Sequence, residues 1–196
     1  MSPEERTILK KLSTPIKIQD FLDTLEIGGA FYTSALRTLH ARKARCFEGA
    51  LLAAFILSFH GEKPLLLDLK AASPDFDHVV ALYRKNGYWG AVSKTNYVSL
   101  RFRDPVYKTI RELALSYFHE YFVNKTGKKT LRSYSKPFNL NKQKIDWIAS
   151  EKKLDDLAIV LDESPHFPLF PKKNLKYIRK ADKMERKAGE IVEWGD

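Results

Sequence analysis

The chain has 196 residues, of which 44% are hydrophobic, and carries a formal net charge of +10. This length favours a single domain with a sizeable core. No apolar run reaches the roughly 18 residues of a membrane span, the first residues lack the pattern of a signal peptide, and the single cysteine excludes an internal disulfide. We therefore expect a cytoplasmic protein with no membrane partner, whose positive charge favours anionic partners.

The first 44 residues carry the signals of short helices. Ser2 and Glu5 form a capping box for a helix over about residues 2–12. Apolar spacing predicts a second helix over residues 16–25 and a third over residues 31–37. These helices form an N-terminal part of the predicted domain.

Residues 46–57 begin with the only cysteine and continue with small and apolar side chains on every side of the helical wheel. This pattern predicts a helix that is buried all round and ends near His60-Gly61. Cys46 then lies at the first turn, where free N–H groups and the helix dipole favour a thiolate. A lone cysteine is more often a small hydrophobic core residue than a reactive thiol.

Short apolar runs follow the helix and predict antiparallel strands over residues 64–70, 77–83, 88–93 and 97–103. Asn86-Gly87 is a strong signal for a type I′ hairpin turn between the second and third of these strands. We assign residues 45–104 to the core that carries the predicted site.

Residues 105–196 predict a helical and irregular C-terminal extension. Apolar spacing indicates a helix over residues 106–122, and shorter helices are expected over 145–149 and 154–161. Several prolines in residues 164–171 predict an irregular segment. A strongly charged, exposed helix is expected over residues 172–187.

The hairpin turn fixes which side chains share a face of the sheet. Pairing Lys85 with Tyr88 and counting outward places His78 and Ser93 on one face as diagonal neighbours. Ser93 or Thr95 could then accept the second N–H of the imidazole and fix its tautomer. A helix packed on that face would bring Cys46 to His78, the arrangement that a thiol nucleophile and its base require.

The remaining histidines are weaker candidates for the base. His60 lies at the far end of the same helix as Cys46, and His119 and His166 have no recognisable partner in the sequence. His40 lies on a loop that the sequence does not place.

The order of these features resembles that of the transglutaminase-like superfamily of papain-like fold. It consists of Cys46 at the head of a buried helix, a strand, His78 on the next strand, and the stretch Trp89-Gly90-Ala91-Val92-Ser93. The resemblance covers roughly residues 45–96. In that family a Trp-containing strand supplies an Asp as the third catalytic residue, and here Ser93 stands in that place.

The resemblance implies an α+β fold in which the nucleophile-bearing helix packs on an antiparallel sheet, with added helices at both ends. It assigns Cys46 as nucleophile, His78 as base and Ser93 as the residue that orients the base, with Thr95, Asn96 and Asp77 as alternatives. Ser93 offers a neutral hydrogen bond, which is weaker than the charge-assisted bond of an Asp. No cofactor and no metal is implied.

The sequence thus favours a cysteine enzyme of acyl transfer or amide hydrolysis acting on a protein, a peptide or a small acyl substrate. One alternative is a catalytically silent interaction module on the same fold. Another is a binder of nucleic acid or of another anionic partner. It rests on two basic groups, namely Lys125, Lys128, Lys129, Arg132 and Lys136, and Lys172, Lys173, Lys176, Arg179, Lys180 and Lys183. Such charge runs are also typical of a solvated surface.

Overall fold

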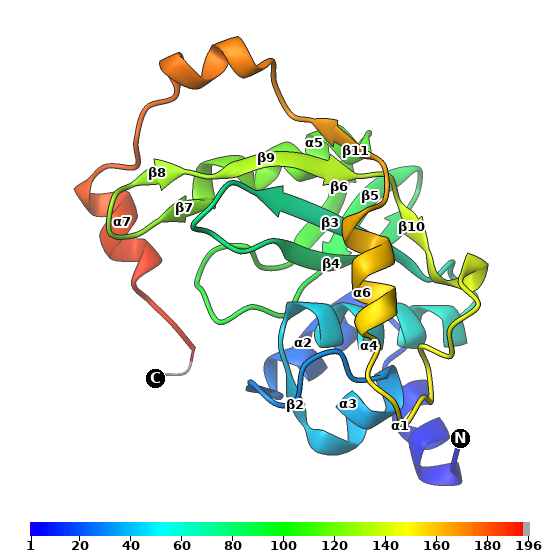
Figure 1. Ribbon diagram of the computed structural model, residues 1–196. Helices are drawn as coiled ribbons and strands as arrows, with labels where there is room; N and C mark the ends of the chain where they lie inside the picture. Colours follow the sequence, from blue (N-terminus) through cyan, green and yellow to red (C-terminus); the bar gives the residue numbers. More distant parts are fainter. Residues whose placement is uncertain (194–196) are drawn as a thin grey trace.

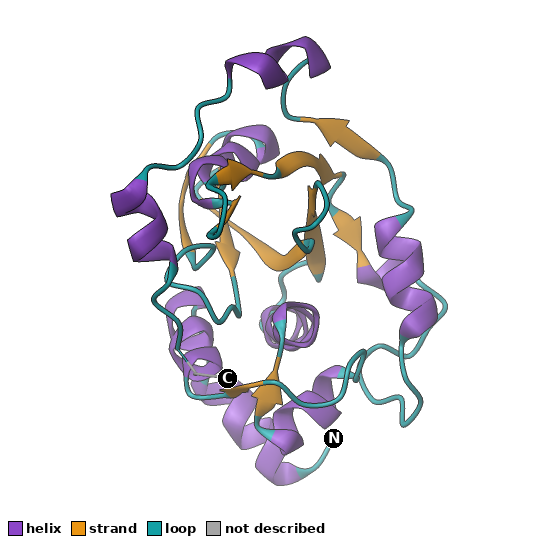
Figure 2. Ribbon diagram, turned by 60° about the vertical axis from the view of Figure 1, so that its left-hand side comes forward, coloured by secondary structure: helices purple, strands orange, loops and turns teal. Residues whose placement is uncertain are grey.

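A seven-stranded sheet organises the computed structural model, which describes residues 1–193. The strands lie in the order β11 (His166–Pro168), β9 (Leu131–Ser135), β3 (Leu65–Ala71), β4 (His78–Lys85), β5 (Tyr88–Val92) and β6 (Arg103–Tyr107), and β10 (Phe138–Asn139) also pairs with β3. All of these pairs are antiparallel. Figure 2 shows that the sheet is strongly curved. The fold is therefore mixed α/β with an antiparallel sheet.

Two small sheets complete the strand pairing of the described residues. The first joins β1 (Glu26–Ile27) to β2 (Lys43–Ala44) in parallel, directly before the cysteine helix. The second joins β7 (Phe122–Val123) to β8 (Lys128–Lys129) in an antiparallel hairpin. Among residues 1–193, every helix is too short or too polar to traverse a bilayer.

The helix that carries the cysteine, α4 (Cys46–Phe59), lies between the sheet and the N-terminal helices α1 (Pro3–Lys11), α2 (Pro15–Asp23) and α3 (Ala35–Ala41) (Figure 1). All its residues from Phe47 to Leu57 are buried, so the predicted burial on all sides is confirmed. Each fully buried leucine or phenylalanine contributes about 1.5–3 kcal/mol relative to an exposed one. The burial fixes α4 against the sheet and, with it, the position of Cys46.

The two faces of the sheet bury separate cores because side chains alternate along each strand. On one face, Val79 and Ala81 of β4 pack in the same core as α4. On the other face, Val80 and Leu82 pack with Leu113 of α5 (Ile110–Ser116). The predicted arrangement of a cysteine helix on an antiparallel sheet, with further helices towards both ends of the chain, is confirmed.

The hairpin between β4 and β5 is formed as predicted. Asn86 and Gly87 both have positive φ angles, 50° and 86°, as a type I′ turn requires. The register pairs Lys85 with Tyr88 and Leu82 with Ala91. The predicted geometry around His78 therefore starts from the correct strand alignment.

The capping box of Ser2 and Glu5 is present at the start of α1. The helix predicted over residues 154–161 is confirmed as α6 (Asp155–Asp162). The helix predicted over 106–122 is shorter, because α5 gives way to η1 (Phe118–Glu120). Residues 145–149 form turns instead of a helix, and η2 (Leu140–Lys142) precedes them.

Other predictions for these outer segments were wrong. Residues 97–102 form a loop, and β6 begins only at Arg103 and runs through Pro105, which an edge strand tolerates. Residues 166–168 form edge strand β11 although they contain a proline. The charged segment 172–187 divides into η3 (Lys172–Tyr177) and α7 (Lys183–Gly189), because the Asp182 side chain caps a new helix start.

A close contact between α4 and the chain after β5 depends on Gly49. A Cβ atom at this position would lie 2.4 Å from Cβ of Lys94. Lys94 is fully buried, and its Nζ pairs with Glu193 Oε1 at 3.0 Å. Because Gly49 lies one helical turn after Cys46, this contact brings the segment that begins at Ser93 alongside the first turns of α4.

We expect Gly49→Ala to destabilise the protein by about 1–3 kcal/mol, because neither main chain nor Cβ at Lys94 can move aside cheaply. Helix propensity alone predicts the opposite sign, a gain of about 1 kcal/mol. Urea unfolding followed by circular dichroism measures the difference. Ser58→Ala, on the same helix near its far end, serves as the control, and a stabilised Gly49→Ala variant would contradict the close contact.

Candidate functional site

Cys46 is the first residue of α4, and a buried carboxylate fixes the chain around it. Glu48 Oε2 accepts a hydrogen bond from the N–H of Arg45 at 3.2 Å, and Oε1 accepts one from the N–H of Tyr32 at 2.6 Å. The Arg45 guanidinium lies 4.3 Å from the centre of the Phe31 ring. The loop before α3 is thereby tied to the start of the cysteine helix.

The Cys46 thiol is held in its protonated form. Burial raises its pKa, and the carboxylates of Glu48 and Asp68 raise it further, whereas hydrogen bonds from the N–H groups of Val79 and Phe47 lower it. The expectation that the helix start favours a thiolate is therefore wrong. The dipole of α4 acts on the sulfur, but loss of hydration outweighs it.

His78 begins β4, and its imidazole is buried with only 4% of the residue exposed. Its Nε2 lies 2.8 Å from Ser93 Oγ and 3.2 Å from the carbonyl oxygen of Leu100. Ser93 Oγ in turn donates to the same carbonyl at 2.6 Å. Because a carbonyl can only accept, Nε2 carries the proton and Nδ1 is the basic nitrogen. The predicted contact between His78 and Ser93 is present.

Burial also keeps the imidazole neutral. It lowers the pKa of His78 to about 4, and the nearby Arg103 guanidinium acts in the same direction. The Tyr117 ring meets the imidazole edge to face at 6.4 Å between ring centres. A carboxylate in the place of Ser93 would stabilise an imidazolium, and a hydroxyl does so much less.

Ser93 is itself fixed by a residue that the sequence did not reveal as part of a site. Gln19 of α2 donates from Nε2 to the carbonyl of Ser93 at 2.8 Å and accepts from its N–H at 2.9 Å. These two bonds replace strand pairing just beyond the end of β5. Gln19 can be found only from the packing, because it lies 74 residues before Ser93.

Leu100, which accepts from both His78 and Ser93, has a left-handed backbone with φ of 61°. This conformation costs a non-glycine residue roughly 1–2 kcal/mol, and Leu100 is nevertheless buried. The surrounding packing therefore holds a strained residue whose carbonyl fixes the imidazole tautomer.

Two of the alternative orienting residues have other partners. Thr95 Oγ1 accepts from the N–H of Tyr97, and Asp77 Oδ1 accepts from the N–H of Ala71. The third alternative, Asn96, contributes its carbonyl oxygen to the N–H of Glu193. Ser93 is the predicted residue that contacts the His78 ring.

The sulfur of Cys46 and the imidazole of His78 approach the same short stretch of β4. The N–H of Val79 lies near enough to the sulfur to lower its pKa, and this nitrogen is bonded directly to the carbonyl carbon of His78. The imidazole leaves the strand on the other side, towards Tyr117. In the described part of the chain no hydrogen bond joins the sulfur to the ring, and Nδ1 makes none either. Cys46 and His78 therefore lie on opposite faces of β4. The prediction that the cysteine helix packs on the face of His78 is wrong, because α4 covers the face of Val79 and Ala81, whereas His78 shares its face with Tyr117 and Leu100.

A second cluster of ionisable groups lies close enough to influence the thiol. Asp68, Asp77 and Asp162 each place a carboxylate oxygen within 4.8 Å of the other two. Burial and the charge of Asp77 raise the pKa of Asp68 to about 6. Its Oδ1 is buried without a hydrogen-bond partner among the described residues. These three side chains could hold a cation.

Two basic groups already contact this acidic cluster. Lys70 Nζ lies 2.7 Å from Asp162 Oδ1, and His166 Nε2 lies 3.1 Å from Asp68 Oδ2. His166 therefore has a partner that the sequence did not indicate, since 98 residues separate the two. A helical or strand pattern carries no signal for such a contact.

The other histidines have structural partners. His40 Nε2 lies 2.7 Å from Glu5 Oε1, His60 Nε2 bonds the carbonyl of Leu9, and His119 Nδ1 lies 3.1 Å from Lys129 Nζ. We therefore retain His78 as the candidate base.

The sequence matches no model of a known protein family, and no curated protein is significantly similar to it. The function is therefore inferred from the geometry of Cys46, His78 and Ser93.

The low pKa of His78 makes stability depend on pH. A base whose pKa falls from 6.5 to about 4 on folding stabilises the folded chain above pH 6.5, and this contribution is lost as pH falls towards 4. When the pH falls from 7.5 to 4.5, the free energy of unfolding should decrease in both proteins. We expect this decrease to be smaller by about 2–3 kcal/mol in His78→Gln than in the unmodified chain. Urea unfolding at both pH values measures the difference. Equal losses in the two proteins would contradict a neutral, buried imidazole.

The raised pKa of Cys46 predicts slow alkylation at neutral pH. Because the thiolate is the reactive form, the rate of modification by iodoacetamide should rise with pH to above 9. Mass spectrometry follows this single cysteine without background. A plateau below pH 8 would show a stabilised thiolate and would contradict the dominance of burial.

Proposed function

We propose that this chain is a cysteine-nucleophile enzyme of acyl transfer or amide hydrolysis on a papain-like, transglutaminase-like core. One observation carries the proposal. Nε2 of His78 is hydrogen-bonded to Ser93, which leaves Nδ1 as the basic nitrogen on the residue next to the N–H that contacts Cys46. A base and a group that orients it therefore lie one residue from the strand position that the cysteine helix covers, on the opposite face of β4, and this proximity along the strand supports the proposal.

In the proposed acylation, substrate binding brings the sulfur and Nδ1 together around the start of β4, because the resting chain holds them on opposite faces of this strand. The Cys46 thiol gives its proton to Nδ1 as the sulfur bonds to the carbonyl carbon of an amide or ester. The resulting imidazolium then protonates the departing amine or alkoxide, and a thioester remains on Cys46. Water or an amine completes the reaction, with its proton accepted by the same nitrogen.

The negative oxygen that forms during attack needs hydrogen-bond donors. The first N–H groups of α4 have no acceptor within the helix, and the N–H groups of Phe47 and Val79 lie near enough to the sulfur to lower its pKa. When the sulfur moves towards a substrate, these donors are available to the developing oxyanion. The same groups thus hold the resting thiol and serve the transition state.

The neutral resting state separates this proposal from a preformed thiolate–imidazolium pair. Both the raised pKa of Cys46 and the low pKa of His78 favour neutral partners. Proton transfer must then accompany attack. The rate should consequently depend on His78 at neutral pH, but not at a pH high enough to ionise the thiol directly.

The test uses p-nitrophenyl acetate as the acyl donor, with the acetyl thioester on Cys46 measured by mass spectrometry. At pH 7 we expect His78→Gln to slow acylation by about 10²- to 10⁴-fold, the usual contribution of a general base. Ser93→Ala should slow acylation by about threefold to tenfold, which corresponds to the free energy of one neutral hydrogen bond. Near pH 11 the effect of His78→Gln should largely disappear.

His60→Gln is the matched control, because His60 follows the far end of the same helix and bonds only a main-chain carbonyl. It should leave the acylation rate unchanged. Equal acylation rates in His78→Gln and His60→Gln would show that His78 does not activate Cys46. That result would favour the alternative of a catalytically silent interaction module.

A further inference from the structure

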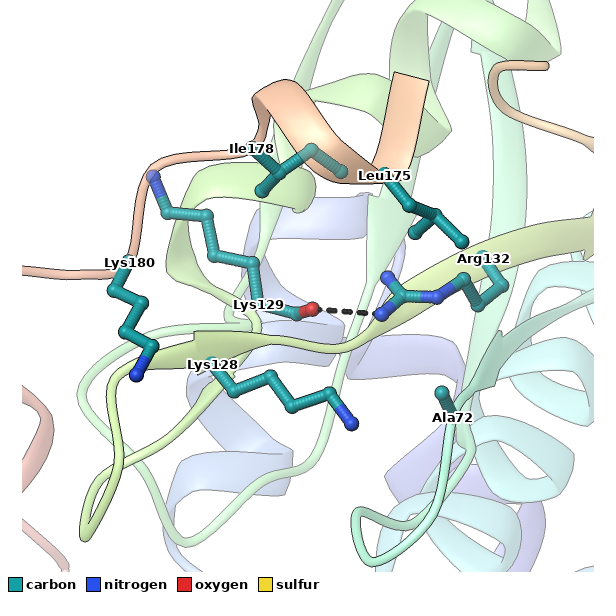
Figure 3. Close-up of a pocket in the computed structure, with 7 residues that line it drawn as sticks. All are labelled: Ala72, Lys128, Lys129, Arg132, Leu175, Ile178 and Lys180. Atoms are coloured by element: carbon teal, nitrogen blue, oxygen red, sulfur yellow. Dashed lines mark hydrogen bonds between the residues drawn. The ribbon is translucent and has the colours of Figure 1, made fainter. Parts of the chain in front are cut away.

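A basic pocket lies away from the catalytic candidates, between the edge of the sheet and the C-terminal segment. It has a volume of about 490 Å³ and is lined by Ala72, Lys128, Lys129, Arg132, Leu175, Ile178 and Lys180. Figure 3 shows Leu175 and Ile178 on one side and Lys128 and Lys180 on the other, with Arg132 between Leu175 and Ala72. None of its lining residues belongs to the site of Cys46, His78 and Ser93.

The pocket joins the two basic groups that stand far apart in the sequence. Lys128, Lys129 and Arg132 come from the first group, and Lys180 comes from the second. The carbonyl of Gly127 accepts the N–H of Ala181 at 2.8 Å, which ties the C-terminal segment to the β7–β8 turn. Four cationic side chains therefore surround one concave surface, and no acidic residue lines it.

These charges are poorly compensated within the protein. The Arg132 guanidinium donates to the carbonyls of Leu131 and Lys129 at 2.9 and 3.0 Å instead of to a carboxylate. Burial lowers the pKa of Arg132, as expected for a cation that loses water without gaining an anion. Lys128 and Lys180 form no ion pair among the described residues.

Lys129 gives the pocket a buried cation. Only 7% of Lys129 is exposed. Its Nζ lies 3.1 Å from His119 Nδ1 and 4.0 Å from Glu185 Oε1. One carboxylate at this distance balances part of the positive charge gathered in the pocket.

The opposite wall is apolar. Leu175 and Ile178 face the cations across the pocket (Figure 3). A volume of this size is typical of a small-molecule site, whereas nucleic-acid strands are tracked by longer grooves. We propose that this pocket binds a small organic phosphate, with its phosphate groups on the lysines and Arg132 and its apolar part against Leu175 and Ile178.

The test measures binding of pyrophosphate and ATP by isothermal titration calorimetry. The variant Lys128→Gln/Lys180→Gln removes two exposed pocket cations. The matched control, Lys172→Gln/Lys173→Gln, removes the same charge from exposed positions of η3 outside the pocket. We expect the dissociation constants of both ligands to rise by about tenfold or more in the pocket variant. In the control variant they should rise by less than about twofold.

ATP should bind more tightly than pyrophosphate because it can also contact the apolar wall, and Leu175→Ser should reduce this advantage. Binding of a single-stranded oligonucleotide is measured in the same way, because it reports general electrostatic attraction to the basic surface. Absence of pyrophosphate and ATP binding at millimolar concentration would overturn the proposal. It would also be overturned if both double variants weakened phosphates and oligonucleotide equally, which would indicate a general basic surface.

Discussion

The burial of α4 between the sheet and the N-terminal helices is the constraint on which the site depends. It holds the first turn of α4 against β4, so that the sulfur of Cys46 reaches the main chain at Val79. Gly49, one turn further on, lets the chain after β5 pass close to the helix. The same packing therefore positions the nucleophile, the strand that carries the base, and the segment that orients it.

Burial also decides the charge of the site, and it acts on both partners in the same direction. Removing water disfavours the thiolate of Cys46 and the imidazolium of His78 alike. A carboxylate beside the ring would compensate the imidazolium. The Ser93 hydroxyl instead donates a hydrogen bond to the carbonyl oxygen of Leu100. A hydroxyl in this place gives a fixed tautomer and leaves the resting pair uncharged.

Periodicity predicted the parts of this fold in which local sequence and burial agree. The Asn86-Gly87 turn and the strand alternation sufficed to place His78 beside Ser93. The apolar run after Cys46 predicted a buried helix, but the face of the sheet that this helix covers was predicted wrongly, because a helix that is apolar on all sides shows no preferred face. Three features could not be predicted, because each depends on packing between segments that are distant in the sequence. They are the hydrogen bonds from Gln19 to Ser93, the left-handed backbone of Leu100, and the contact between Asp68 and His166. The sequence predicted a lowered pKa for Cys46, whereas the pKa is raised. The position of the thiol at a helix start can be inferred from the sequence, but its loss of hydration becomes visible only in the packed structure.

In the proposed enzyme, a protonated thiol and a neutral base on opposite faces of β4 constrain how the site can work. Because burial opposes ionisation of the thiol and the charges of Glu48 and Asp68 add to this effect, the thiolate is rare at neutral pH, and the sulfur reacts slowly with electrophiles that are not bound. A bound acyl group changes this balance only if it brings a carbonyl carbon to the sulfur and lets the proton pass to Nδ1 in the same step. The selectivity of the proposed enzyme would then depend on the geometry that substrate binding enforces on Cys46 and His78, and the intrinsic reactivity of the cysteine would contribute little to it.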